Sequence, residues 1–420
     1  MQNQLPMFKT LAFTVFFMLA YTVQAQTLQE LNAQSTKAYE GKDYAKFLSL
    51  AEQINVMRPS HPVYTYNLAC AYALNSNPQK AIETLRTSVL MNNKTDFEND
   101  ADLAALKPLE SYQNLIKLKS DLDIPLVHSQ KAISLSEKDL HPEGFAFLSK
   151  TKTWLVTSIR KGKIVSFDKT GKCTDWLNGE MFSVFSIKSD KAEKYLWVAT
   201  AAMPEQKGFV KANAGKAEIL KVDIRAKKIV QRFSVPGNHV FGDLVVAKNG
   251  IIYISDSGTA IIYKIENDTL SEWLDLKNQA FNLQGITLNA RQDKIYIADY
   301  LKGILEISIL DKKYSWLDFP DGTVVKGIDG LLWHDNSLVA IHNGVKPIRI
   351  IRYFLNETGD KISNYKVIDN NRPEFDEPAL GCIVNGDFYF FANNPWKGYD
   401  ADFNLDETKF ESPMLFKFPL

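Results

Sequence analysis

The chain has 420 residues, of which 45% are hydrophobic, and its 49 Lys and Arg balance its 49 Asp and Glu. This length exceeds one ordinary hydrophobic core, and the composition excludes a mainly disordered chain. Binding to nucleic acid or to an anionic membrane needs an excess of clustered cationic side chains, so the zero net charge supports neither partner.

The first 25 residues have the pattern of a secretory signal. Lys9 is their only charged residue, the apolar run 10–23 follows it, and Val23 and Ala25 are the small residues of a cleavage site. The run is shorter than the about 20 residues that a membrane-spanning helix needs. We therefore predict that residues 1–25 are a signal peptide and that the mature protein is secreted or periplasmic, with no membrane span. The alternative is an uncleaved N-terminal anchor.

Residues 26–120 have few Gly and Pro, and their apolar residues recur three and four positions apart, which predicts helices. Leu68 and Tyr72 lie on one such face, and Ala81 and Leu85 lie on the next, after a break that contains a proline. This spacing of large and small residues resembles the tetratricopeptide pattern of closely packed antiparallel helices. We predict a small all-α, tetratricopeptide-like domain. The resemblance implies a docking role or a groove for a protein partner.

After residue 125, short runs rich in Val, Ile, Tyr, Phe and Trp alternate with turn residues, which is typical of strands. These runs form six similar units at intervals of about 41 to 57 residues. The units begin near His141, Phe182, His239, Phe281, Gly327 and Phe375. A four-stranded blade must stack on its neighbours to bury both of its faces. The sequence therefore predicts an all-β six-bladed propeller over residues 121–420.

The sixth unit ends at its third strand, residues 414–420 (MLFKFPL). A strand-like run immediately before the first unit, residues 131–137 (KAISLSE), is the predicted fourth strand of that blade. Pairing between the two ends of the propeller sequence would close the ring and remove exposed strand edges.

The innermost strand of each blade lines the central channel, so the residues at its start point toward the axis. Five of the six units carry an acid or an amide there: Glu143, Asp243, Gln284, Asp329 and Glu377. Their oxygen atoms are the hard ligands that suit a calcium- or magnesium-like ion. The alternative is that these side chains cap turns or hydrogen-bond around a water-filled channel. Glycines beside three of them are predicted to allow close backbone approach at the axis: Gly144, Gly285 and Gly330.

From about Leu140 to the C-terminus, the sequence resembles the superfamily of senescence-marker protein, gluconolactonase and luciferin-regenerating enzyme, with strictosidine synthase-like relatives. The resemblance is carried by residues 141–147 (HPEGFAF), 283–289 (LQGITLN) and 327–333 (GIDGLLW). It implies a six-bladed propeller that binds a divalent cation, calcium first, to polarise a lactone or ester carbonyl.

The resemblance also implies roles for individual residues. Glu143 and Asp329 match two ligands of the cation, and Asp329 also matches the candidate base. Gln284 stands where the family has Asn, and Gly242 stands where family hydrolases commonly have another Asn. Strictosidine synthase-like relatives place a catalytic Glu on a late blade without a metal, which Glu377 matches by analogy.

Four further residues near the predicted channel mouth are candidate contacts for a small-molecule ligand: His141, His239, Asp243 and Trp396. The histidines lack metal-ligand spacing, so packing is the alternative for both. Trp396 follows a strand beside a proline and is predicted to be exposed, where it can stack on a ligand. Polar residues that end second strands are predicted to form turns instead: Asp256, Asp299 and Asn393.

These observations leave three hypotheses. The first is an exported, divalent-metal-dependent hydrolase of lactones or small esters, with Glu143, Gln284 and Asp329 as ligands. The second is a non-catalytic propeller that binds a small molecule or a protein, with the helical domain as a docking element. The third is a metal-independent enzyme that uses Glu377.

Overall fold

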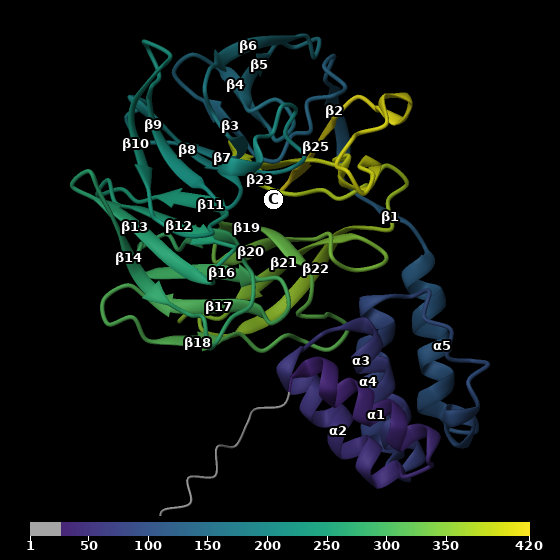
Figure 1. Cartoon of the computed structure of the whole chain (residues 1–420). Coiled ribbons are helices and arrows are strands. Elements are labelled where there is room, and N and C mark those ends of the chain that lie inside the picture. The colour runs from purple at the N-terminus through teal and green to yellow at the C-terminus, as the bar shows by residue number, and fades with distance from the viewer. Residues whose placement is uncertain (1–26) are drawn as a thin grey trace, which may run out of the picture.

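The computed structural model describes residues 27–420, so the predicted signal peptide lies outside the described residues. A helical region is followed by a six-bladed β-propeller (Figure 1), which confirms the predicted fold class. Within the described range, no helix is both long and apolar enough to cross a membrane.

The helical region consists of two antiparallel helix pairs and a closing helix. Its elements are α1 (Leu28–Glu40), α2 (Tyr44–Met57), α3 (Pro62–Leu74), α4 (Pro78–Met91), the short 3-10 helix η1 (Ala101–Leu106) and α5 (Glu110–Asp123). The predicted hairpin is α3 and α4, in which Ala69, Ala81 and Leu85 are fully buried in one apolar cluster. Pro78 begins α4, where its missing N–H leaves no helical hydrogen bond unmade.

Each blade is an antiparallel sheet, and in blades 1 to 4 the four strands follow one another in chain order outward from the axis. Blades 1 and 2 contain β3 (Phe145–Leu148), β4 (Thr153–Ser158), β5 (Lys163–Phe167), β6 (Cys173–Asn178), β7 (Ser183–Ser189), β8 (Tyr195–Ala201), β9 (Ala217–Asp223) and β10 (Lys228–Ser234). Blades 3 and 4 contain β11 (Phe241–Val246), β12 (Ile252–Asp256), β13 (Ile261–Glu266), β14 (Thr269–Asp275), β15 (Leu283–Leu288), β16 (Lys294–Asp299), β17 (Gly303–Ser308) and β18 (Tyr314–Trp316). The hydrophobic core lies between successive blades.

Blades 5 and 6 include strands from the segment that follows α5. Blade 5 contains β19 (Ile328–His334), β20 (Ser337–His342), β21 (Arg349–Leu355) and β22 (Ile362–Asn370), and blade 6 contains β23 (Gly381–Val384), β24 (Asp387–Phe391) and β25 (Met414–Pro419). β2 (Gln130–Ser134) pairs with β25 as the fourth strand of blade 6, which confirms the predicted closure of the ring. β1 (Leu126–Val127), which the sequence analysis did not predict, adds a fifth strand to blade 5.

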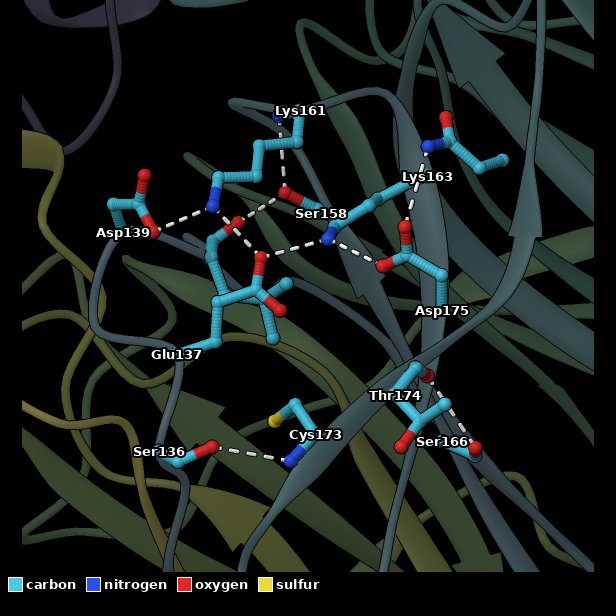
Figure 2. Close-up of polar contacts among 12 residues, drawn as sticks. Ser136, Glu137, Asp139, Ser158, Lys161, Lys163, Ser166, Cys173, Thr174 and Asp175 are labelled. Atoms are coloured by element: carbon cyan, nitrogen blue, oxygen red, sulfur yellow. Dashed lines mark hydrogen bonds and ion pairs between the residues drawn. The ribbon is translucent and has the colours of Figure 1, made fainter.

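A network of ion pairs holds the segment after β2 against blade 1 (Figure 2). The Glu137 carboxylate lies 2.7 Å from Lys161 Nζ and 2.8 Å from Lys163 Nζ. Lys161 also pairs with Asp139 at 2.6 Å, and Lys163 pairs with Asp175 at 2.5 Å. Strand pairing therefore joins β2 to blade 6, and these ion pairs join the segment after β2 to blade 1.

The helical region packs against blade 5. Met91 and Val345 belong to one buried apolar cluster, and the Lys346 N–H donates to the Met91 carbonyl at 2.9 Å. The buried Arg349 guanidinium donates to the Leu90 carbonyl. Strands alternate in direction, so the loop between β20 and β21 lies at the same end of the ring as the starts of the innermost strands. The helices therefore dock beside blade 5, against a loop at the same end of the ring as the predicted acids (Figure 1).

The ion-pair network predicts a stability effect. Glu137→Gln should lower the free energy of unfolding by roughly 1–3 kcal/mol, because one half-buried carboxylate serves two lysines. Glu266→Gln is the matched control, since Glu266 forms one ion pair with Lys264 on blade 3 and should change stability by about 0.5 kcal/mol. Urea unfolding measures both values, and equal effects would contradict a special role for the closure network.

Candidate functional site

A cavity of about 380 Å³ lies at the end of the axis where the innermost strands begin. Residues from all six blades line it, and they include six of the predicted site residues: Glu143, Asp243, Gln284, Asp329, Glu377 and Trp396. Phe185 also lines the cavity and packs in the apolar cluster between blades 2 and 3. The propeller thus gathers residues that are far apart in the sequence around one space.

Close backbone contacts between innermost strands bring these residues together. A Cβ atom at Gly144 would lie 2.5 Å from the Phe185 carbonyl oxygen, and one at Gly330 would lie 2.5 Å from the Ala379 carbonyl oxygen. Gly285 has no room for a Cβ either. The structure therefore confirms that all three glycines allow neighbouring blades to approach at the axis.

Glu143 lies in the loop before β3 and is only 7% exposed. Its backbone N–H donates to Thr157 Oγ1 at 3.3 Å, but its Oε2 atom is buried without a hydrogen-bond partner among the described residues. Burial first, and then the charge of Asp329, raise the pKa of Glu143 well above its ordinary value, while a hydrogen bond from Trp396 lowers it. This carboxylate lacks the compensation that a buried charge needs.

Asp329, at the start of β19, is held by a chain of side chains from two other loops. Asn343 Nδ2 donates to Asp329 Oδ2 at 2.5 Å, and the Tyr300 hydroxyl donates to Asn343 Oδ1 at 3.0 Å. Burial raises the pKa of Asp329 to about 7, although the hydrogen bond from Asn343 lowers it. The sequence analysis missed Tyr300 and Asn343. Each directly follows the end of a second strand, a position that marks the same end of the blade.

Asp243 belongs to the wall of the cavity. Its two carboxylate oxygens accept hydrogen bonds from Ser186 Oγ at 2.6 Å and from the Ile286 N–H at 3.1 Å. These donors lie on blades 2 and 4, so Asp243 links three blades. Its hydrogen-bonding role is therefore largely structural, although it lines the predicted site.

Gln284 and Gly242 occupy adjoining positions in the cavity. Gln284 Nε2 donates to Asn282 Oδ1, which leaves Oε1 as the free acceptor. Oε1 lies 3.9 Å from the position that a Cβ atom would take at Gly242. The longer side chain of Gln284 therefore reaches toward the space left by the missing side chain at Gly242.

Glu377 and Trp396 complete the cavity from blade 6. Glu377 has a positive φ of 55°, and its Oε1 lies 3.7 Å from Lys397 Nζ. Burial raises the pKa of Glu377, while Lys397 lowers it. Trp396 begins the short helix η3 (Trp396–Gly398) and is half-buried, so the prediction that it is exposed was wrong. It packs on the core cluster of blades 2 and 3 while it faces the cavity.

The two predicted histidine contacts do not line the cavity. His141 is fully buried: its Nδ1 lies 2.9 Å from the Tyr399 hydroxyl, and its ring meets Trp396 edge to face at 4.4 Å. His239 Nδ1 lies 2.6 Å from Asp256 Oδ2. Both nitrogens of His239 are paired, since its Nε2 lies 3.0 Å from the Pro236 carbonyl oxygen, whereas the buried His141 Nε2 has no hydrogen-bond partner in the described structure. Because neither ring lines the cavity, the structure favours the packing alternative for both.

Of the three polar residues predicted to form turns at the ends of second strands, Asp256 and Asp299 do so. Asn393 instead accepts a hydrogen bond from the Met414 N–H at 2.8 Å, so it links the loop to β25. Asp299 accepts hydrogen bonds from four backbone N–H groups, including those of Phe281 and Asn282. Asp256 accepts from the Val240 and Gly258 N–H groups. These acids anchor the loops that border the cavity.

The cavity offers oxygen ligands to a cation. Within residues 27–420, no group of three or more His, Cys, Asp and Glu side chains is placed to hold a metal ion. The predicted set consists of two carboxylates and one amide oxygen, and the buried, unpartnered Glu143 Oε2 is an acceptor that lacks a positive partner. The donor chemistry of Glu143, Gln284 and Asp329 therefore fits a calcium- or magnesium-like ion.

No family model matches the chain, and no curated protein matches it in sequence. Similar solved structures include virginiamycin B lyase from Staphylococcus aureus, with 15% identity, a TM-score of 0.45 and coverage of 70% of this chain and 88% of the lyase. A gluconolactonase from Xanthomonas campestris has 12% identity, a TM-score of 0.45 and coverage of 70% and 94%, respectively. A luciferin-regenerating enzyme has 12% identity, a TM-score of 0.47 and coverage of 71% and 96%. At this level of similarity, the activities of these proteins say nothing about that of this chain.

The close approach at the axis predicts that Gly144→Ala destabilises the protein by about 1–3 kcal/mol, because the added methyl group meets backbone atoms of blade 2. Gly179→Ala is the control, since a Cβ atom at Gly179 has no neighbour within 4 Å. Thermal unfolding of both variants measures the difference. A Gly144→Ala protein as stable as the control would show that the blades can separate at the axis.

Proposed function

We propose that this protein is an exported, divalent-cation-dependent hydrolase of lactones or small esters, with the axial cavity as its active site. The observation that carries the proposal is the buried, unpartnered oxygen of Glu143 beside the charge of Asp329. Two neighbouring carboxylates, one buried and one half-buried, that raise each other's energy are stabilised by a cation between them. The signal-like pattern of residues 1–25 supports export.

Glu143, Asp329 and the free Oε1 of Gln284 would hold the cation. A bound divalent cation supplies positive charge that polarises a carbonyl group and lowers the pKa of water. Calcium is the first choice, because all three ligands are oxygen atoms and calcium accepts variable geometry.

Asp329 has the contacts of a general base. Asn343 occupies its Oδ2, and Tyr300 fixes Asn343, so Oδ1 is left to accept the proton of an attacking water molecule. Glu377 faces the same cavity and can return a proton to the leaving oxygen. Phe185 and Trp396 form an apolar wall that excludes water and can pack on the ring of a lactone.

Calcium binding is tested by thermal unfolding. Calcium should raise the unfolding temperature of the wild type, because a ligand that binds only the native state stabilises it. Asp329→Asn should abolish this shift. Asp376→Asn is the control, since Asp376 pairs with Lys397 at 2.6 Å and does not line the cavity. An equal shift in all three proteins would contradict the proposed cation site.

Hydrolysis is tested separately with simple lactones and short-chain aryl esters, with calcium and after chelation. The proposal expects turnover that chelation removes and that Asp329→Asn lowers by about 100-fold or more. Calcium binding without turnover of any lactone or ester would support a non-catalytic binding protein. Turnover that survives chelation but not Glu377→Gln would favour the metal-independent alternative.

A further inference from the structure

A second cavity, of about 530 Å³, lies where blade 6 meets blade 1 (Figure 1), and we call it the junction cavity. Among residues 27–420, none that lines it also lines the axial cavity. The loops after β3 and after β5 border it, and because strands alternate in direction, these loops lie at the end of the ring opposite the axial acids. Its volume falls within the about 300–1,000 Å³ that is usual for small-molecule sites.

Three half-buried aromatic side chains form one wall of the junction cavity: Trp154 on β4, Phe167 on β5 and Tyr389 on β24. The ring centres of Trp154 and Phe167 are 6.0 Å apart, with their planes at 16° to each other. The centres of Trp154 and Tyr389 are 4.9 Å apart. All three border the apolar cluster that joins blade 6 to blade 1. This wall therefore offers a surface on which a planar ring can stack.

The aromatic wall is uncovered, unlike other aromatic rings on the blades. For example, Lys302 Nζ lies over the ring of Trp316, 4.5 Å from its centre. Within the described part of the chain, no lysine or arginine lies over the rings of Trp154, Phe167 or Tyr389. The cations beside this wall thus leave it open to a ligand.

Four lysines from four different segments line the same cavity: Lys131 on β2, Lys152 after β3, Lys169 after β5 and Lys417 on β25. Lys417 Nζ lies 3.9 Å from the carboxylate of Asp387. The other three are exposed and form no ion pair or side-chain hydrogen bond with any described residue. The junction cavity therefore has a positively charged rim beside its aromatic wall.

The rest of the described lining does not neutralise this rim. Its one acid, Asp168, uses Oδ1 to accept hydrogen bonds from the Thr170 N–H at 2.8 Å and the Lys172 N–H at 3.1 Å, so it serves a turn. The described lining contains no Ser, Thr, Asn or Gln, whose neutral polar side chains are suited to the hydroxyl groups of a sugar. The lining is matched instead to a ligand that combines a flat apolar part with negative charge.

We propose that the junction cavity is a second ligand site, which binds a small aromatic anion. The ring of the ligand stacks on the wall of Trp154, Phe167 and Tyr389, and its anionic group lies between Lys152 and Lys169. Lysine ammonium groups bind carboxylate, sulfonate and phosphate groups as point charges. This site goes beyond the proposed hydrolase activity and does not depend on it, because the two cavities share no described residue.

The site is tested with naphthoate as the probe, by calorimetric titration of the full chain. Naphthoate should bind saturably to the wild type. Lys152→Met and Lys169→Met should each weaken binding by about threefold, and the double variant by about tenfold, because each change removes one exposed positive charge from the rim. The neutral naphthalenemethanol and the non-aromatic anion cyclohexanecarboxylate should both bind more weakly than naphthoate, since each lacks one of the two recognised features.

Lys150→Met and Lys172→Met are the matched controls, since these lysines lie on the same two loops but do not line the junction cavity. Both should bind naphthoate as the wild type does, and so should Asp329→Asn, which alters only the axial cavity. Absence of binding in the wild type, equal affinity in the double variant and the controls, or equal affinity for naphthoate and naphthalenemethanol would overturn the proposal. Loss of naphthoate binding in Asp329→Asn would place the anion in the axial cavity and would also overturn it.

Discussion

Repulsion among the carboxylates gathered around the cavity at one end of the axis is the constraint on which the rest of the site depends. Hydrogen-bond donors and cations compensate the negative charge of each acid to a different degree. Asp243 receives hydrogen bonds from two neighbouring blades, Glu377 lies near Lys397, and Asp329 accepts one amide hydrogen bond. The charge of Glu143 is the least compensated, because one of its carboxylate oxygens is buried without a hydrogen-bond partner in the described structure. The need for positive charge is therefore concentrated on the side of the cavity where Glu143 and Asp329 lie, and this asymmetry is what supports the proposed cation site over a hydrogen-bonded channel lining.

The closed ring is what keeps these acids together. Blade 6 is completed by β2, and the Leu380 N–H donates to the Glu143 carbonyl at 3.3 Å across the closure. Positive φ angles at His141 and Glu377 lie on the two sides of this junction. Such backbone conformations cost about 1–3 kcal/mol each and persist where the surroundings enforce them. The ion pairs of Glu137 and the pairing of β2 with β25 stabilise the same junction from outside, so closure and site geometry depend on each other.

The blades and the axial acids could be predicted because they follow from local patterns. Strand alternation and turn residues repeat within each unit, and the start of an innermost strand always faces the axis. The chain from Tyr300 through Asn343 to Asp329 could not be predicted, since it depends on how two loops pack. The burial of His141 has the same origin, because the partners of its ring come from an insertion more than 200 residues away in blade 6. Strand pattern thus placed the axial acids at the cavity, and loop packing decided which loop residues join them there.

The helical region is held to the propeller by buried contacts as well as by the chain connection. Its docking on blade 5 buries Met91 in an apolar cluster with Val345, and the buried Arg349 guanidinium donates to the Leu90 carbonyl. A buried guanidinium is unfavourable without hydrogen-bond acceptors, and burial lowers the pKa of Arg349 to about 10. The carbonyl of Leu90, in the last turn of α4, supplies one of these acceptors, so the docked helix stabilises the charge of Arg349 at the start of β21. Blade 5 also carries Asp329 and Asn343 at the cavity, and the stability of this part of the site therefore depends in part on the docking of the helices.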